Sequence, residues 1–473
     1  MFSTLASNNA APMAGPAQAH AFFADLGVLP VIGVAAPFVL LLLCIAVLPL
    51  ASPHFWEKNR NKSVVAFVFA VPIAILVLSK ESNTFASTLL DYGAFIALLS
   101  ALFTISGGIY VRGSFKGNPL VNTAFLLVGA VLANFIGTTG ASVLLVRPLL
   151  RANKHRNRKA HVFVFFIFIV SNCGGLLTPL GDPPLFLGFL NGVPFSWTLR
   201  LWREWAFIVG TLLVIAYLVD RWFYARDHAA PGEKAETAAA DTATATERIG
   251  LEGLLNVALL ILVIGVILVS GYAIYPIEGH RIFDETLGAQ LAKIVQIAGL
   301  GSIAFASYRL ANREVHRQNT FHFGPLVEVA VLFAGIFVTM IPVLLILETK
   351  GASLGVNQPW HFFWATGGLS SVLDNAPTYL TFSSLAKGIL GLSSAEGLKA
   401  VVHDPTGAKY LAAISAGAVF MGANTYIGNG PNFMVKAIVE ASGVKMPTFF
   451  GYILVSIVVL LPLFALTTVI FFI

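Results

Sequence analysis

The chain has 473 residues, of which 57% are hydrophobic and only 11% are charged, and its mean hydropathy is +0.82. Soluble globular domains carry about 25% charged residues, so this composition excludes an ordinary water-soluble protein. The net charge of +6 comes from basic residues in short segments between apolar runs, which argues against a nucleic-acid-binding surface. Cys44 and Cys173 both lie inside apolar runs, so neither a disulfide framework nor a metal-ligand cluster is expected.

Long apolar runs predict about ten membrane crossings in two groups. Residues 1–26 form an N-terminal tail that lacks the basic and apolar regions of a cleaved signal peptide. The spans predicted in the first group are residues 27–50, 64–78, 94–111, 161–190 and 205–224. Those in the second group are residues 251–274, 293–308, 326–347, 410–435 and 449–473.

Two further apolar segments are too long for a simple span, and each carries a polar patch near its middle. Residues 119–150 contain GTTGAS at 137–142, and residues 361–392 contain SSVLDNAPT at 370–378. Backbone groups freed at such a break cannot face lipid, so they must be buried in protein or line a wet cavity. We therefore expect two re-entrant hairpins, each of which enters the membrane and returns to the same side.

Residues 227–250 separate the two groups of spans and are small and polar, with Ile249 the only large apolar residue. This composition predicts a flexible linker. Residues 27–226 then form a first repeat and residues 251–473 a second, each with about five spans, one of them broken, and one hairpin. An odd number of crossings inserts the second repeat upside down relative to the first, as in many secondary carriers.

Lys and Arg in the short loops set the predicted orientation. They concentrate in residues 58–62, 112–116, 151–159 and 309–317, which we place in the cytoplasm together with the linker. Both termini then lie outside the cytoplasm. The first hairpin enters from the cytoplasm and the second from the other side, as an inverted repeat requires.

The spans at 161–190 and 410–435 are interrupted by Gly and Pro and align with each other. Thr178, Gly181, Asp182, Pro184 and Phe186 of the first fall on the second span's Thr425, Gly428, Asn429, Pro431 and Phe433. Proline removes a backbone donor and glycine permits unwinding, so each span is expected to be two half-helices whose free ends can coordinate an ion. The residues assigned to helix breaks are Gly181, Pro183, Pro184, Pro377, Gly428, Gly430 and Pro431.

The side chains at these patches are rich in oxygen and poor in nitrogen, which favours a hard cation. Asp182 and Asp374 are the carboxylates placed deepest in the membrane, and a carboxylate that holds a proton and a cation in turn can support exchange. A helix cap is the alternative for Asp374, and a structural turn is the alternative for Asp182. For the other candidates capping and coordination stay equally open: Asn172, Asn375, Asn424, Asn429, Thr138, Thr139, Thr178 and Thr425.

The segments SNCGGLLTPLGDPPLF at 171–186, LDNAP at 373–377 and NTYIGNGPN at 424–432 resemble those of the ion transporter superfamily. More narrowly, they are similar to its NhaD-like sodium/proton antiporter and citrate transporter-like branches. The resemblance implies a scaffold held against a dimer partner and a transport part, made of the hairpins and broken spans, that moves as an elevator. It also implies an ion and substrate site lined by Thr138, Thr139, Asn172, Asp182, Asp374, Asn375, Asn424 and Asn429.

The sequence thus predicts a secondary active transporter of the inner membrane that exchanges Na+ for H+ as a homodimer. The tips lack the Ser-Asn-Thr of carboxylate carriers, and no Lys or Arg lies at a break, so sodium-coupled uptake of citrate or a related carboxylate is the alternative. The sequence has neither a Walker A motif nor a nucleophile elbow, so ATP-driven transport and hydrolase chemistry are not expected. We expect no enzymatic activity, cofactor, resident metal or nucleic-acid partner.

Overall fold

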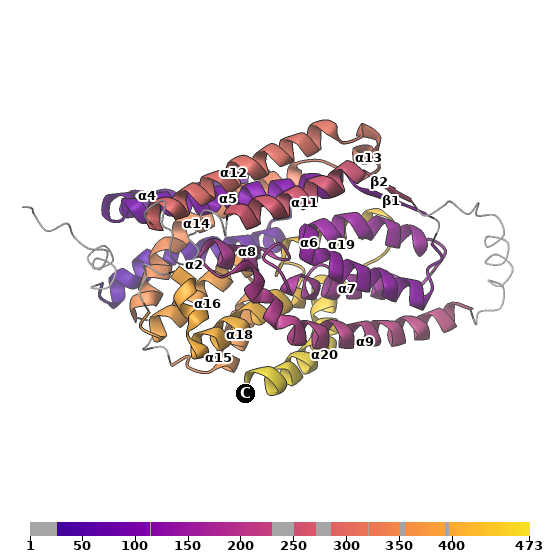
Figure 1. The fold of residues 1–473 in the computed structure, drawn as a ribbon. Coiled ribbons are helices and arrows are strands. Elements are labelled where there is room, and N and C mark those ends of the chain that lie inside the picture. The colour runs from indigo at the N-terminus through magenta and orange to yellow at the C-terminus, as the bar shows by residue number, and fades with distance from the viewer. Residues whose placement is uncertain are drawn as a thin grey trace, which may run out of the picture.

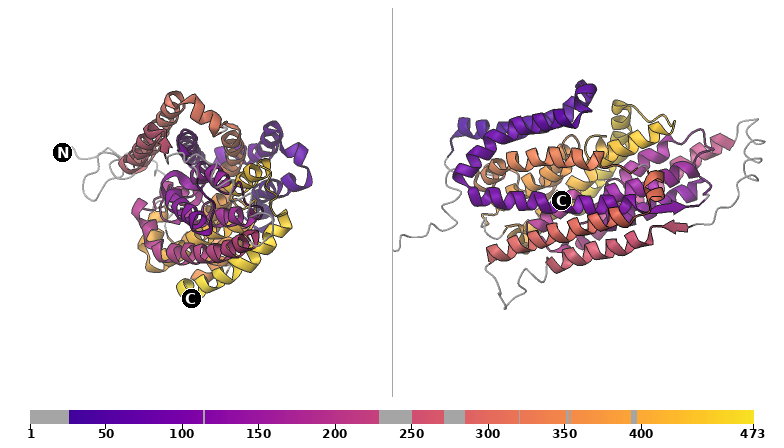
Figure 2. Two further views of the ribbon diagram at one scale, coloured as in Figure 1. Left: turned by 90° about the vertical axis from the view of Figure 1, so that its right-hand side faces the viewer. Right: turned by 90° about the horizontal axis from the view of Figure 1, so that it is seen from above.

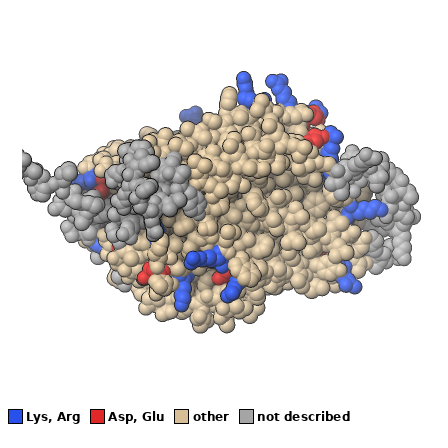
Figure 3. Space-filling model, viewed as in Figure 1, with Lys and Arg blue, Asp and Glu red and all other residues tan. Residues whose placement is uncertain are grey.

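The computed structural model describes residues 26–113, 115–228, 250–270, 285–319, 321–350, 353, 355–392 and 397–473. Eight helices within these ranges are long and apolar enough to cross a membrane. The long helices run along a common direction (Figure 1), and charged side chains lie mainly towards the margins of the face in Figure 3, whose middle is uncharged. The predicted all-α polytopic membrane fold is confirmed.

The first half follows the predicted order of elements. Its elements are α2 (Val28–Ala51), α3 (Pro53–Trp56), α4 (Asn59–Lys80), α5 (Ser82–Gly107), β1 (Tyr110–Arg112), α6 (Pro119–Ala152), α7 (Ala160–Ile169), η2 (Cys173–Leu176), α8 (Pro183–Leu190), η3 (Phe195–Leu201) and α9 (Trp202–His228). The first hairpin is α6. The first broken span consists of α7, η2 and α8.

The second half repeats this order. Its elements are β2 (Gly250–Glu252), α11 (Leu254–Val269), α12 (Glu285–Leu310), α13 (Arg313–Gln318), α14 (Gly324–Lys350), α15 (Pro359–Ser370), α16 (Asn375–Ile389), α17 (Gly397–His403), α18 (Pro405–Met421), η7 (Gly422–Asn424), α19 (Gly430–Ala441), α20 (Phe449–Thr467) and η8 (Thr468–Phe472). The second hairpin is α15 with α16, and the second broken span is α18, η7 and α19. The end of the predicted span 251–274 lies outside the described residues.

A short β-ribbon, which the sequence did not predict, joins the two halves. Strands β1 and β2 pair antiparallel, with Tyr110 opposite Glu252, and Arg112 forms an ion pair with Glu252. The predicted span 94–111 was therefore wrong at its end, because the helix stops at Gly107 and the next residues pair with β2. The ribbon thus holds the C-terminal end of the predicted linker against the segment that follows α5.

The helices pack in two groups, which we call the frame and the site bundle. The frame comprises α2, α4, α5, α11, α12 and α14, and the site bundle comprises the hairpins, the broken spans, α9 and α20. Viewed end-on, the frame lies on one side of the molecule (Figure 2). Within the frame α5 packs along α12, and α14 packs along α4. If α4 and α5 correspond to α12 and α14 in two repeats, these two pairs are the same contact seen from each repeat. The groups meet where α5 packs on α6 and where α14 packs on α16.

The first hairpin, α6, consists of two helical arms that fold back on each other. A straight helix of the 34 residues in α6 would be about 51 Å long. Instead, the Gly117 amide at one end donates to the Ala152 carbonyl at the other at 2.8 Å, and the Asn122 and Asn153 side chains exchange hydrogen bonds of 3.0 and 2.7 Å. The chain reverses at Gly137, whose φ of +75° favours glycine. The first hairpin therefore has its tip in the interior and its two arms side by side.

Close glycine contacts shape the breaks in the two broken spans. A Cβ added to Gly181 would lie 2.1 Å from the Gly175 carbonyl oxygen, and one added to Gly428 would lie 2.6 Å from the Gly422 oxygen. The same pair of glycines, six residues apart, thus closes a tight backbone loop in each half. Any side chain at these positions would force the loop open.

Replacing Gly181 with alanine is expected to destabilise the protein, because the new Cβ meets a backbone oxygen that cannot move aside. Overpacking of this kind typically costs about 1–3 kcal/mol. The matched control is Gly210→Ala in α9, where a new Cβ has no atom within 4 Å. Thermal unfolding in detergent, followed by size-exclusion chromatography, measures both variants, and equal melting midpoints would contradict the packing argument.

Candidate functional site

The tips of both hairpins and the breaks of both broken spans meet around the carboxylate of Asp182, which is 1% exposed. Its Oδ1 accepts a hydrogen bond from the Thr138 hydroxyl at 2.7 Å and one from the Asn429 amide at 3.2 Å. Its Oδ2 accepts one from the Asn375 amide. Thr138 comes from hairpin α6, Asn375 from hairpin α15–α16 and Asn429 from the second broken span. The site is therefore built from both halves of the chain.

Equivalent backbone positions place Asp182 and Asn429 opposite each other. Each residue immediately precedes the second helix of its broken span, with φ and ψ of −148° and 146° for Asp182 and −152° and 140° for Asn429. Prolines occupy the first turn of both following helices, where a missing backbone donor costs nothing. The predicted break prolines thus start new helices, and the same local fold presents an acid in one half and an amide in the other.

A second layer of amide side chains joins the two broken spans behind Asp182. The Asn172 amide donates to the Asn432 Oδ1 at 2.7 Å, and the Asn172 Oδ1 accepts from the Asn429 amide at 3.2 Å. The Asn432 amide in turn donates to the Thr425 carbonyl at 2.9 Å. Because Asn172 and Asn432 are fully buried, each of these bonds replaces a lost bond to water and fixes the position of Asn429.

The predicted threonines of the broken spans hold the hairpins in place and do not contact Asp182. The Thr178 hydroxyl donates to the Asn134 carbonyl at 2.5 Å, and the Thr425 hydroxyl donates to the Ser371 carbonyl at 2.5 Å. These are the same contact in each half, between a broken span and the hairpin before it. The Asn424 amide also donates a hydrogen bond to the Ser371 Oγ in the second hairpin at 2.8 Å.

Asp374 and Thr139 lie beside the site but outside this hydrogen-bond network. Asp374 is half-buried and caps helix α16, with its Oδ1 accepting from the Ala376 amide at 3.1 Å. That is the capping contact which the sequence left open as an alternative. Thr139 is also half-buried, whereas Thr138 next to it reaches Asp182. The roles of Asp374 and Thr139 as ion ligands stay predictions.

Sequence reasoning missed several residues that shape the site. Asn134 binds the first break through its Oδ1, which accepts from the Leu177 amide at 2.8 Å. Ser171 bonds Ser142 through their hydroxyls at 2.8 Å and offers its carbonyl to the Asn429 amide at 3.2 Å. The available signal for Asn134 was a single amide between apolar residues in a predicted hairpin arm, where an unpaired polar group would be costly.

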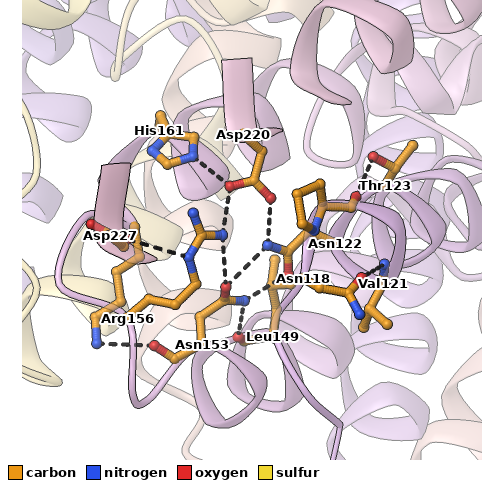
Figure 4. Close-up of polar contacts among 12 residues, drawn as sticks. Asn118, Val121, Asn122, Thr123, Leu149, Asn153, Arg156, His161, Asp220 and Asp227 are labelled. Atoms are coloured by element: carbon orange, nitrogen blue, oxygen red, sulfur yellow. Dashed lines mark hydrogen bonds and ion pairs between the residues drawn. The ribbon is translucent and has the colours of Figure 1, made fainter. Parts of the chain in front are cut away.

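A separate polar cluster fixes the base of the first hairpin (Figure 4). The Asp220 carboxylate on α9, 3% exposed, accepts from Arg156 at 2.5 Å, from His161 at 2.8 Å and from Asn122 at 2.8 Å. Asn153 bonds both Asn122 and Arg156. The cluster therefore ties both hairpin arms to α7 and α9 and anchors the base of the first hairpin within the site bundle.

A family described as "Putative citrate transport" matches residues 28–472. The chain belongs to this family. The match includes both hairpins, both broken spans and the whole frame, so it confirms a citrate-transporter-like member of the superfamily that the motifs resemble. The match supports a role as a transporter and does not confirm the predicted similarity to the NhaD-like branch. Among curated proteins, none matches the chain significantly.

Replacing Thr138 with valine is expected to lower the free energy of unfolding, because Asp182 would lose a buried donor without gaining space. Leaving a buried acceptor without its donor costs about 1–3 kcal/mol. Thr139→Val is the matched control, since this neighbour does not bond Asp182. Chemical unfolding in detergent micelles measures both, and equal losses of stability would show that the Thr138 contact contributes nothing specific.

Proposed function

We propose that the protein is a cation-coupled secondary transporter in which Asp182 binds the coupling ion. The observation that carries this proposal is a carboxylate, 1% exposed, whose side-chain donors Thr138, Asn375 and Asn429 are all neutral. A buried carboxylate without an opposite charge is costly, and either a proton or a metal cation removes that cost.

Asn375 supports a cation at this place. Its amide donates to Asp182, while its own Oδ1 is buried and has no hydrogen-bond partner. Buried acceptors are almost always paired. Rotation of the Asn375 amide would turn its Oδ1 towards Asp182, and a cation between them would then be coordinated by oxygen atoms of both, the ligand type that hard cations prefer.

Sodium/proton exchange is the function that this site supports best. One carboxylate cannot hold a proton and a sodium ion at the same oxygen atoms at the same time, so the two ions compete. When the site faces each side of the membrane in turn, competition for one acid produces antiport. The elevator motion of the site bundle against the frame, which the family resemblance implies, would supply the alternating access.

Sodium-coupled transport of citrate or a related carboxylate is the second candidate, and two observations favour it. The family is described by citrate transport. In addition, helices α8, α16 and α19 and the second arm of α6 all begin at the site. Helix N-termini carry a partial positive charge and exposed amides, which can hold an anion without any basic side chain.

Several further parts of the proposal rest on the resemblance and on the loop charges. These are the homodimer, the placement in an inner membrane with both termini outside the cytoplasm, and transport without enzymatic turnover. The boundaries of the two repeats at residues 27–226 and 251–473 stay predictions as well. The exchanged packing of α5 with α12 and of α14 with α4 supports them.

The proposal is tested by reconstituting the protein in vesicles that contain a pH-sensitive dye and imposing a Na+ gradient. We expect sodium-driven proton flux. Asp182→Asn should reduce it to the level of empty vesicles, because an amide can neither release a proton nor supply the negative charge that would bind Na+. Glu440→Gln is the matched control and is expected to retain flux, since Glu440 lies in the last turn of α19 with its side chain 40% exposed and paired with Lys436.

Repeating the experiment with labelled citrate separates the two candidates. Sodium-driven proton flux in the absence of citrate supports the antiporter. Citrate uptake that requires sodium, with no proton flux when citrate is absent, replaces it with the carboxylate carrier. Full flux in Asp182→Asn would remove Asp182 from the mechanism in both cases.

A further inference from the structure

A buried ion pair joins the second hairpin to the frame. Lys387 lies in the last turn of α16 and Glu348 lies in the last turn of α14, with 2.9 Å between the ammonium nitrogen and Oε1. The two side chains are 6% and 14% exposed. A Cβ on the adjacent Gly388 would be 2.4 Å from the Leu347 carbonyl oxygen, so the two helices touch through their backbones at this point.

An arginine makes the corresponding contact between the first hairpin and the frame. Arg151, near the end of the second arm of α6, donates to the Tyr110 hydroxyl and to the Val111 carbonyl, both at 2.7 Å. Its guanidinium also lies over the Tyr110 ring, 4.8 Å from the centroid. Tyr110 and Val111 lie in β1, the strand that comes after frame helix α5.

The two contacts occupy equivalent places in the two repeats. Each cation stands near the end of a hairpin arm that runs outward from the site. The partner of Lys387 stands at the end of α14, and the partners of Arg151 lie in β1, just after α5, the frame helix equivalent to α14. The ribbon beside Arg151 and the hairpin α15–α16 lie towards opposite ends of the molecule (Figure 1). A polar contact therefore crosses the boundary between frame and site bundle at each end.

We propose that these two contacts are latches that open during the transport cycle: Lys387 with Glu348 at one end, and Arg151 with Tyr110 and Val111 at the other. This inference rests on the proposed transport function. A hydrogen-bonded ion pair has one geometry, and breaking it leaves each charge without its partner, so these contacts hold the site bundle and the frame in one register. Movement of the site bundle along the frame must therefore break the latches, and their re-formation defines where the movement stops.

The test is to lock one latch. Glu348→Cys with Lys387→Cys in the full chain, reconstituted in vesicles, is cross-linked with a short bis-methanethiosulfonate reagent, and flux is measured before cross-linking, after it and after reduction. We expect cross-linking to reduce sodium-driven proton flux or citrate uptake by about tenfold or more, since such gating motions limit turnover. Reduction should restore the flux. Tyr110→Cys with Arg151→Cys repeats the test at the other end, including in the event that the first variant does not fold.

The matched control joins two frame helices. Lys62 on α4 and Glu328 on α14 form an ion pair of 2.6 Å, and cross-linking Lys62→Cys to Glu328→Cys should leave flux nearly unchanged. The unmodified chain, treated in the same way, accounts for Cys44 and Cys173. Flux that survives cross-linking at both latches as well as it survives the control would overturn the proposal.

A readout without transport separates failure of the latch from failure of the proposed function. In the double variant at 348 and 387 without cross-linker, labelling by a membrane-impermeant maleimide should proceed several-fold faster in one ionic condition than in another as sodium, pH and citrate are varied. The control pair should label at a constant rate. Absence of any flux in the unmodified chain refutes the transport proposal alone, whereas constant labelling at both latches refutes the latches.

Discussion

The structure depends on the burial of one carboxylate among neutral donors. Asp182 is held by Thr138, Asn375 and Asn429, which reach it from two hairpins and a broken span. No one of these elements can satisfy its own backbone in a membrane, because each is interrupted. Their breaks are stable only where they meet, so the constraint that closes the fold and the constraint that builds the site are the same.

Small residues make this meeting possible. The loops at Gly175 with Gly181 and at Gly422 with Gly428 bring backbone against backbone, and prolines start the helices that follow. The half-helices then direct their N-termini at the site. Asp182 and Asn429 occupy equivalent backbone positions. Only the first half of the chain therefore carries an acid at this position. The proposed function uses this asymmetry: the acid would bind a cation, and the helix N-termini would be able to attract an anion.

The match to a citrate-transport family and the geometry around Asp182 support different parts of the proposed function. The family match supports a transporter, whereas the geometry around Asp182 supports the proposed site for a coupling ion. In the proposed cycle, Asp182 would bind the coupling ion for either candidate function, and the site bundle would move along its boundary with the frame. The polar contacts of Lys387 and Arg151 lie on the boundary between the site bundle and the frame, at the ends of the hairpin arms distant from Asp182.

The sequence by itself determined the spans, the hairpins, the broken helices and the residues of their breaks, because hydropathy and the positions of Gly and Pro are local properties. It also placed Asp182 among the candidates. It did not distinguish Asp182 from Asp374, and it missed Asn134, the β-ribbon and the Asp220 cluster. Only the tertiary structure decided that Thr138, Asn375 and Asn429 converge on Asp182 while Asp374 caps a helix. The contacts to Asp182 join residues 44 to 247 positions apart and follow from how the hairpins and the broken spans pack.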